Sequence, residues 1–211
     1  MPYRIDLFAV FIFLGIVQGL FLLVFFLSRE NRKSKANLFH GLMLLCIVAC
    51  LTEIFLMYTG YIVHVLYLVD FSEAFGVAIG PCFYLLVLSL VHGDLDRKNY
   101  LHLVFPIVYL FLQMPFLILP EDAKYNAWIA TYHPDWEHRP FDYTYDPRLF
   151  WVTDNCTEVT IMILFLYGSL GLIEIFKAFR KKEESFWRPS NPVLRTLRWE
   201  VFQLVSATMG I

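Results

Sequence analysis

Carboxylates inside apolar runs are the first residues of this sequence that could do chemistry. Glu53 lies six residues before the end of one run, and Asp154 and Glu158 lie four residues apart at the start of another. Residues four apart share one face of a helix, so Asp154 and Glu158 are expected to point the same way. A charge inside a bilayer costs roughly 2.5–3.5 kcal/mol on insertion scales. The three acids therefore predict an outward-facing pocket for a cation, an amine or a proton. The alternative is a neutral Glu53 hydrogen-bonded to a neighbouring helix, with Asp154 and Glu158 in water.

The segment from Tyr125 to Tyr145 is the second candidate site, because it is rich in aromatic side chains and also contains two histidines. Aromatic surfaces with a few convergent polar groups suit the recognition of small molecules. Trp128, His133, Trp136 and His138 are therefore candidate ligand-binding residues. The histidines and the acids between them could hold a metal ion, but none is expected. The alternative is an aromatic belt at the membrane surface, which needs no ligand.

Catalytic motifs are absent from the sequence. It has no GxSxG, HExxH or Walker loop, and its cysteines and histidines lack zinc-binding spacing. Neither an enzymatic activity nor a cofactor is expected.

The amino-acid composition predicts the kind of fold that holds these candidate residues in place. Hydrophobic residues make up 58% of the 211 residues, charged residues 17%, and the mean hydropathy is +0.57. A soluble domain has roughly 45–50% apolar and about 25% charged residues. The excess apolar surface predicts a polytopic membrane protein, built as an all-α bundle because helices satisfy their own backbone hydrogen bonds in lipid.

Apolar runs of about 20 residues can cross a bilayer. They predict spans at about 7–27, 38–59, 74–91, 101–119, 151–176 and 197–211, with an outer loop at 120–150. Tyr61–Val69 is apolar but too short to cross the bilayer. It could be a re-entrant segment or a segment that lies at the membrane surface. The last run would rise only about 22 Å, so the chain is expected to stop inside its sixth span, with a seventh missing.

The positions of the cations predict the orientation. Thirteen of the 17 Lys and Arg residues fall in the connections after the first, third and fifth spans. Connections rich in Lys and Arg face the cytoplasm. The N-terminus is therefore expected outside, and a seventh span would return the chain to the cytoplasm.

Small residues and prolines predict how the spans pack. Gly15/Gly19 and Gly76/Gly80 each place two glycines on one helix face, which allows close helix approach. Packing within the bundle is the favoured interpretation, with a homodimer as the alternative. Helix kinks are expected at Gly80–Pro81, Pro106 and Pro115.

Three short motifs carry a family resemblance. The run GPCFYLLVLSL at 80–90 resembles a GP-x-x-Y-x-Y-x-x-S-L pattern, LHLVFP at 101–106 resembles an LHFIP-like start of a span, and LRW at 197–199 resembles the opening of a sixth span. Together they are similar to the seven-helix membrane region of membrane-anchored AraC-type transcriptional regulators. Leu86 stands where the pattern has its second tyrosine. The seventh span and the helix-turn-helix domain are missing, so no DNA-reading residue is carried over.

The resemblance implies the membrane-embedded sensor and anchor of a one-component transcriptional regulator in a bacterial cytoplasmic membrane. Its expected partners are the lipid bilayer, an unknown small outer ligand, and DNA only through the missing C-terminal domain. A small transporter or channel subunit is the alternative, although internal repeats typical of transporters are absent. An orphan multi-pass receptor coupled to a separate kinase is also open.

Overall fold

The computed structural model describes residues 3–140 and 151–209, with side chains described as far as residue 202. Its regular elements are all helical within these residues. In chain order they are α1 (Leu7–Leu27), η1 (Asn31–Lys33), α2 (Lys35–Thr59), η2 (Tyr61–His64), η3 (Leu66–Leu68), α3 (Glu73–His92), η4 (Arg97–Leu103), α4 (Val104–Leu117), α5 (Glu121–Tyr132), α6 (Trp151–Asp154), α7 (Cys156–Lys181) and α8 (Pro192–Met209).

Five segments of the described chain are long and apolar enough to cross a membrane. They are α1, α2, the stretch Leu66–His92 that contains α3, the stretch Arg97–Leu117 that contains α4, and α7. The prediction of an all-helical, multi-pass membrane protein is confirmed at this level. The fifth predicted span began near Trp151, whereas the structure breaks the helix at Asn155 and starts the long helix at Cys156.

The predicted sixth span falls on α8, which is helical as far as Met209 but is not among the five candidate spans. Positions 210–211 of that predicted span lie outside the described residues, as do positions 141–150 of the predicted outer loop. A count of six spans out of seven stays a prediction.

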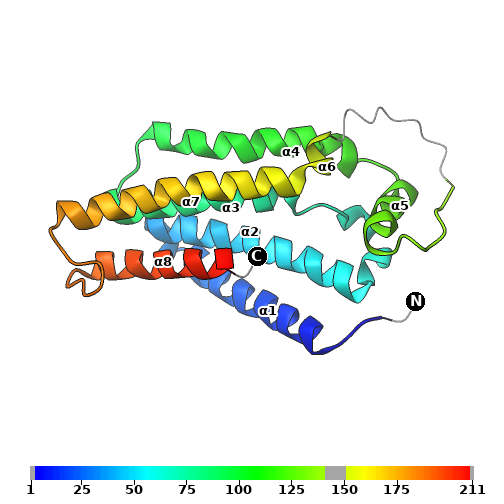
Figure 1. Cartoon of the computed structure of the whole chain (residues 1–211), viewed down its shortest axis with the longest axis horizontal. Helices are drawn as coiled ribbons and strands as arrows, with labels where there is room; N and C mark the ends of the chain where they lie inside the picture. The colour runs from blue at the N-terminus through cyan, green and yellow to red at the C-terminus, as the bar shows by residue number, and fades with distance from the viewer. Residues whose placement is uncertain (1–2, 141–150, 210–211) are drawn as a thin grey trace.

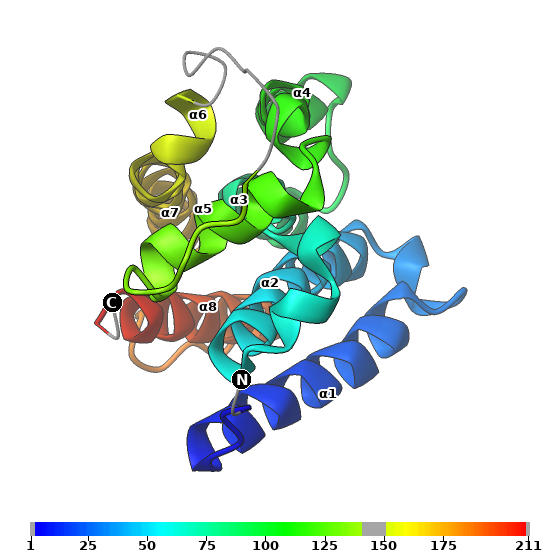
Figure 2. The same cartoon turned by 90° about the vertical axis from the view of Figure 1, so that its right-hand side faces the viewer.

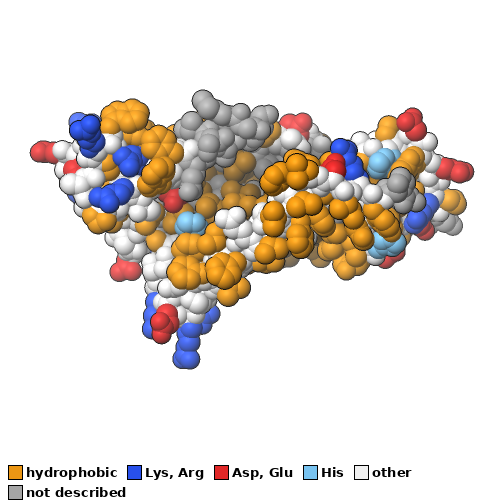
Figure 3. All heavy atoms as spheres, turned by 90° about the horizontal axis from the view of Figure 1, so that it is seen from below, with side chains coloured by type: hydrophobic (Ala, Val, Ile, Leu, Met, Phe, Trp, Pro, Cys, Tyr) orange, Lys and Arg blue, Asp and Glu red, His pale blue; other side chains and the backbone are white. Residues whose placement is uncertain are grey.

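The long helices lie side by side along the length of the molecule, and α3 is the central one (Figures 1 and 2). Most of α3 is buried, while α1 and α4 turn large apolar side chains outward, among them Phe21 and Phe111. Figure 3 views the side on which α1 lies in Figure 1, and hydrophobic side chains cover much of it. An apolar exterior around a buried central helix is the surface that lipid would cover.

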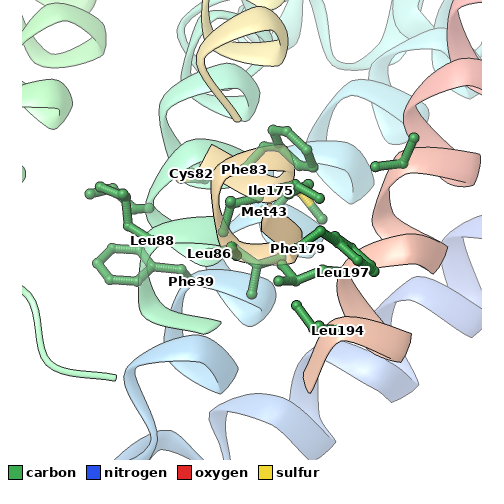
Figure 4. Packing of buried hydrophobic residues seen from close by; sticks show 14 residues of the cluster. Phe39, Met43, Cys82, Phe83, Leu86, Leu88, Ile175, Phe179, Leu194 and Leu197 are labelled. Carbon is green, nitrogen blue, oxygen red and sulfur yellow. The ribbon is translucent and has the colours of Figure 1, made fainter. Parts of the chain in front are cut away.

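Four helices meet in the largest apolar core (Figure 4). Its labelled members come from α2 (Phe39, Met43), α3 (Cys82, Phe83, Leu86, Leu88), α7 (Ile175, Phe179) and α8 (Leu194, Leu197). Leu194, Leu197 and Val201 recur at helical spacing on α8, so one face of that helix is buried against α3 and α7. Lipid tails are as apolar as these side chains, so close packing rather than water exclusion has to hold the helices together.

One glycine in each predicted pair permits a close contact within the chain. A Cβ atom added at Gly80 would lie 3.2 Å from the carbonyl oxygen of Ile163 on α7, and one at Gly19 would lie 2.5 Å from the Val48 side chain on α2. The same atom at Gly15 or Gly76 would meet nothing closer than 3.7 Å. Packing inside the bundle therefore explains Gly19 and Gly80, and a homodimer stays a prediction.

The prolines differ in where they lie. Pro81 and Pro115 are inside α3 and α4, where a missing amide interrupts the helical hydrogen bonds. Pro106 lies in the first turn of α4, where no intrahelical partner is lost. Kinks at Gly80–Pro81 and Pro115 stay predictions, and none is required at Pro106.

The chain between α2 and α3 is compact and largely buried. Gly60 ends α2 in the left-handed conformation (φ 77°), and the short turns η2 and η3 follow. Ile62, Leu66 and Val69 are buried there, in one cluster with apolar side chains of α5. The segment Tyr61–Val69 forms two short turns in place of one continuous helix, and both interpretations of it, re-entrant or interfacial, stay open.

Candidate functional site

Polar side chains from four parts of the chain meet beneath α5, at the end of the bundle where α2 ends and α3 begins. Figure 2 views the molecule from this end, with α5 lying across it. We call this group the buried polar cluster. Its members are Glu53 of α2, Asp70 and Glu73 at the start of α3, Tyr109 and Gln113 of α4, and Lys124 of α5.

Glu53 joins α2 to the start of α3. Its side chain is buried, and Oε2 accepts a hydrogen bond of 2.9 Å from the backbone amide of Ser72, the residue that precedes α3. Backbone amides at a helix start have no partner within the helix, and the helix dipole favours a negative group there. A carboxylate on α2 thus completes the N-terminus of the central helix.

Glu73 joins α3 to α4. Its Oε2 accepts hydrogen bonds from the Tyr109 hydroxyl at 3.0 Å and from Gln113 Nε2 at 2.9 Å. Gln113 Nε2 also donates to the backbone carbonyl of Asp70. Two polar side chains one turn apart on α4 therefore hold both ends of the short Asp70–Glu73 segment.

The side-chain oxygen of Gln113 is left without a partner. Gln113 is fully buried, and Oε1 makes no hydrogen bond in the structure. Both groups that Nε2 contacts are acceptors, so the nitrogen is the amide atom that faces them. Leaving a buried acceptor unsatisfied costs about 1–3 kcal/mol. The cluster therefore has more acceptors than donors.

Lys124 fastens α5 over the cluster. Its side chain is 1% exposed, and Nζ donates to the carbonyl oxygens of Leu117 at 2.8 Å and Tyr67 at 3.2 Å. Burial lowers the pKa of Lys124, and the nearby carboxylates of Asp70 and Glu121 oppose that shift. A single ammonium group thus ties α5 to the end of α4 and to η3.

The backbone at Asp70 adopts the left-handed conformation, with φ of 59°. Few residues other than glycine occupy this region, and strain of order 1–3 kcal/mol persists only where the surroundings enforce it. Here the Asp70 carbonyl accepts a hydrogen bond from Gln113, and its carboxylate is attracted by Lys124, although Glu53 repels it. The turn into α3 is therefore stabilised by its contacts with the cluster.

The cluster brings three carboxylates together with one ammonium group. Three acidic side chains around one ammonium group form a site that can attract positive charge. Within the described residues, no three His, Cys, Asp or Glu side chains converge closely enough to hold a metal ion.

Of the three predicted carboxylates, the structure brings only Glu53 into the cluster. Asp154 ends α6, Glu158 lies in the first turn of α7, and both side chains are exposed. Their neighbours Val152 and Val159 take the positions that pack against Tyr109. The two acids lie at the surface, whereas Glu53 is buried.

Three of the predicted aromatic-loop residues form one stack. The rings of His133 and Trp136 lie parallel with centroids 3.9 Å apart, and the Trp128 ring meets them edge-on at 5.1 and 5.7 Å. Trp128 is buried, and its indole N–H has no partner. His138 is exposed and lies outside this stack.

The chain after α5 folds back onto the helix. Asn126 exchanges two hydrogen bonds of 2.8 Å with the backbone of Arg139, whose guanidinium group lies 3.9 Å from the centre of the Tyr125 ring. Arg139 also pairs with Asp122 at 3.2 Å. Helix α5 and residues 133–139 therefore form a compact cap over the buried polar cluster.

Sequence reasoning did not select five members of the cluster. They are Asp70, Glu73, Tyr109, Gln113 and Lys124. The available signal was the amide of Gln113, a strongly polar side chain in the middle of the apolar run 101–119. Lys124 gave no such signal, because a lysine in a polar connection is ordinarily in water.

No protein-family model, no curated protein and no solved structure matches this chain.

Proposed function

We propose that this chain is the membrane-embedded sensor and anchor of a signalling protein, with the buried polar cluster as its input site. One observation carries the proposal: hydrogen bonds of a single cluster connect α2, α3, α4 and α5. A change of charge or ligand in the cluster alters contacts between all four elements at once. A stimulus that favours one arrangement of these contacts shifts the bundle towards it.

The proposed output is transcription. Support comes from the similarity of residues 80–90, 101–106 and 197–199 to membrane-anchored AraC-type regulators. In this proposal a helix-turn-helix domain that follows the sensor contacts DNA, and no residue of this chain does so. The anchor lies in a bacterial cytoplasmic membrane. Reading the coding sequence past the codon for Ile211 is expected to reveal a further apolar span and then two helix-turn-helix units, and an immediate stop codon would contradict this output.

In the proposed topology the N-terminus and the α5 cap face outward, and six spans of a total of seven belong to this chain. Support comes from the connections rich in Lys and Arg, around residues 29–35, 97–98 and 177–188, which lie at the end of the bundle away from α5 (Figure 1). The buried polar cluster would then face the outer side, where a stimulus arrives.

Cysteine labelling in intact cells tests the topology. We expect Asp135→Cys to react with a membrane-impermeant maleimide, and Lys98→Cys to react only after the membrane is opened. Both positions are exposed, and they lie in the cap and in η4. The four native cysteines, at positions 46, 50, 82 and 156, are replaced first. If only Lys98→Cys were labelled in intact cells, the orientation would be the reverse of the one proposed.

One observation favours the alternative of a small transporter. The backbone between α2 and α3 is broken beside the polar cluster, and broken helices form the ion sites of many transporters. Transporter sites lie near the middle of the membrane, however, whereas this cluster lies at the end of the bundle under a cap. The position of the cluster is why we favour a sensor.

Transcript profiles in the native host test the sensor proposal. We expect deletion of the gene to change a defined set of transcripts, and Glu73→Gln in the full-length protein to change the same set. Glu137→Gln is the matched control, because this acid is exposed in the cap and outside the cluster. Unchanged transcripts after deletion would contradict the proposed output, and ion flux in proteoliposomes would favour the transporter.

A further inference from the structure

We infer that the buried polar cluster binds a small monovalent cation beside the unpaired oxygen of Gln113. This inference names the ligand class of the proposed input site, so its role in signalling rests on the proposed function.

The unpaired oxygen is the first argument. Gln113 Nε2 is committed to Glu73 and to the carbonyl of Asp70, which fixes the direction of Oε1. That oxygen is buried and has no partner, although it lies in a group that is otherwise well connected. A buried carbonyl oxygen with no donor is satisfied by a cation as well as by a hydrogen bond.

The balance of charge is the second argument. Glu53, Asp70 and Glu73 interact electrostatically with one another, whereas Lys124 interacts only with Asp70 of the three and donates its hydrogen bonds to two backbone carbonyls. The other donors, Tyr109 and Gln113, already point at Glu73. Titratable groups at the edge of the site add no positive charge, because they are thiols and a phenol: Cys50, Tyr132 and Cys156. The cluster therefore lacks positive charge.

The available ligands favour a small ion with a single charge. Within the described residues, no three carboxylate, imidazole or thiol groups converge as a divalent transition metal would require. The ligands in this proposal are Gln113 Oε1 and one or two carboxylate oxygens of the cluster, with neutral oxygens of the backbone at 65–72 to complete the site. Carbonyl oxygens of unwound backbone coordinate Na⁺ in many helical transporters. Phe116 and Leu119 are buried in one apolar cluster with Trp128 of the cap, and these large side chains favour a small ion over a larger organic cation.

Thermal unfolding of the purified full-length protein in detergent tests the inference. Choline chloride is exchanged for NaCl or KCl at constant ionic strength and neutral pH, and the unfolding midpoint and tryptophan fluorescence are recorded. We expect a saturable rise of the midpoint with one of the two ions, because a ligand that binds only the folded state stabilises it.

Two variants and one control locate the site. Gln113→Leu and Glu73→Gln are expected to weaken the apparent affinity about tenfold or more, since each removes a ligand or a charge. Gln18→Leu is the matched control, because this amide is exposed on α1 and should leave the affinity unchanged. Glu73→Gln keeps the shape of the side chain. It therefore still tests the site if the Gln113→Leu variant does not fold.

Equal midpoints in choline, Na⁺ and K⁺ would overturn the inference. A midpoint that depends on pH but not on Na⁺ or K⁺ would also overturn it and would identify protons as the occupants. Cation binding without any effect on transcripts would refute the proposed function but support this inference. An effect on transcripts without cation binding would support the proposed function but refute this inference.

Discussion

Lys124→Met is expected to lower the free energy of unfolding by about 2–6 kcal/mol, because two buried carbonyl acceptors would each lose a donor at about 1–3 kcal/mol. Methionine retains an unbranched side chain of similar length but donates no hydrogen bonds. The carbonyls of Tyr67 and Leu117 would lose their donor, and the carboxylate of Asp70 would lose the only ammonium group in the cluster. Equilibrium unfolding in mixed micelles with increasing SDS measures the loss.

A double variant separates the charge interaction from a simple packing defect. Asp70→Asn added to Lys124→Met removes the stranded carboxylate, so the double variant is expected to recover part of the lost stability. Lys98→Met is the matched control, because this lysine is exposed in η4 and its loss should change stability by less than about 0.5 kcal/mol. Equal losses for Lys124→Met and Lys98→Met would refute the anchoring of α5 by Lys124.

The first five predicted spans overlap with the five candidate membrane segments because membrane helices follow a simple physical rule. A run of about 20 apolar residues has to be helical in lipid, and a break in the run ends the helix. The second predicted span stops just before Gly60, and α2 ends at the same place in the structure. The fifth span began too early in the prediction, since hydropathy carries no signal for the local break at Asn155.

The buried polar cluster could not be predicted in the same way. Glu73 and Gln113 are 40 positions apart, and Lys124 lies 57 positions from Tyr67. No local period relates residues at such separations, so only the packing of α3, α4 and α5 brings them together. Hydropathy averaged over a window also hides single polar side chains such as Gln113.

Asp154 and Glu158 illustrate the limit of a spacing rule. Four residues correspond to about one turn, and the prediction that the two acids share a face assumed one continuous helix. The structure separates α6 from α7 between them, and the face that packs inward carries Val152, Cys156 and Val159. The spacing alone could not tell which face of the helix the bundle buries.

Gly80 and Gly76 lie one turn apart on α3, and the same substitution is expected to destabilise the protein only at Gly80. Gly80→Ala should lower the free energy of unfolding by about 1–3 kcal/mol, the usual cost of overpacking a tight contact. Its Cβ would lie 3.2 Å from the backbone oxygen of Ile163 and 3.3 Å from Tyr167 Cβ, and neither atom can move without α7. Gly80→Leu should be worse, since it would push α7 away from the central helix.

Gly76→Ala is the matched control on the same helix face. Its Cβ would meet Cys50 Sγ and Thr160 Cγ2 at 3.8 Å, which is ordinary van der Waals contact. Alanine in a helix interior is about 0.5–1 kcal/mol more favourable than glycine, so this variant should be neutral or slightly more stable. SDS unfolding of the two variants in parallel measures the difference. Equal tolerance of alanine at both positions would mean that α3 and α7 do not approach as closely as the structure places them, and the core of Figure 4 would then be looser than described.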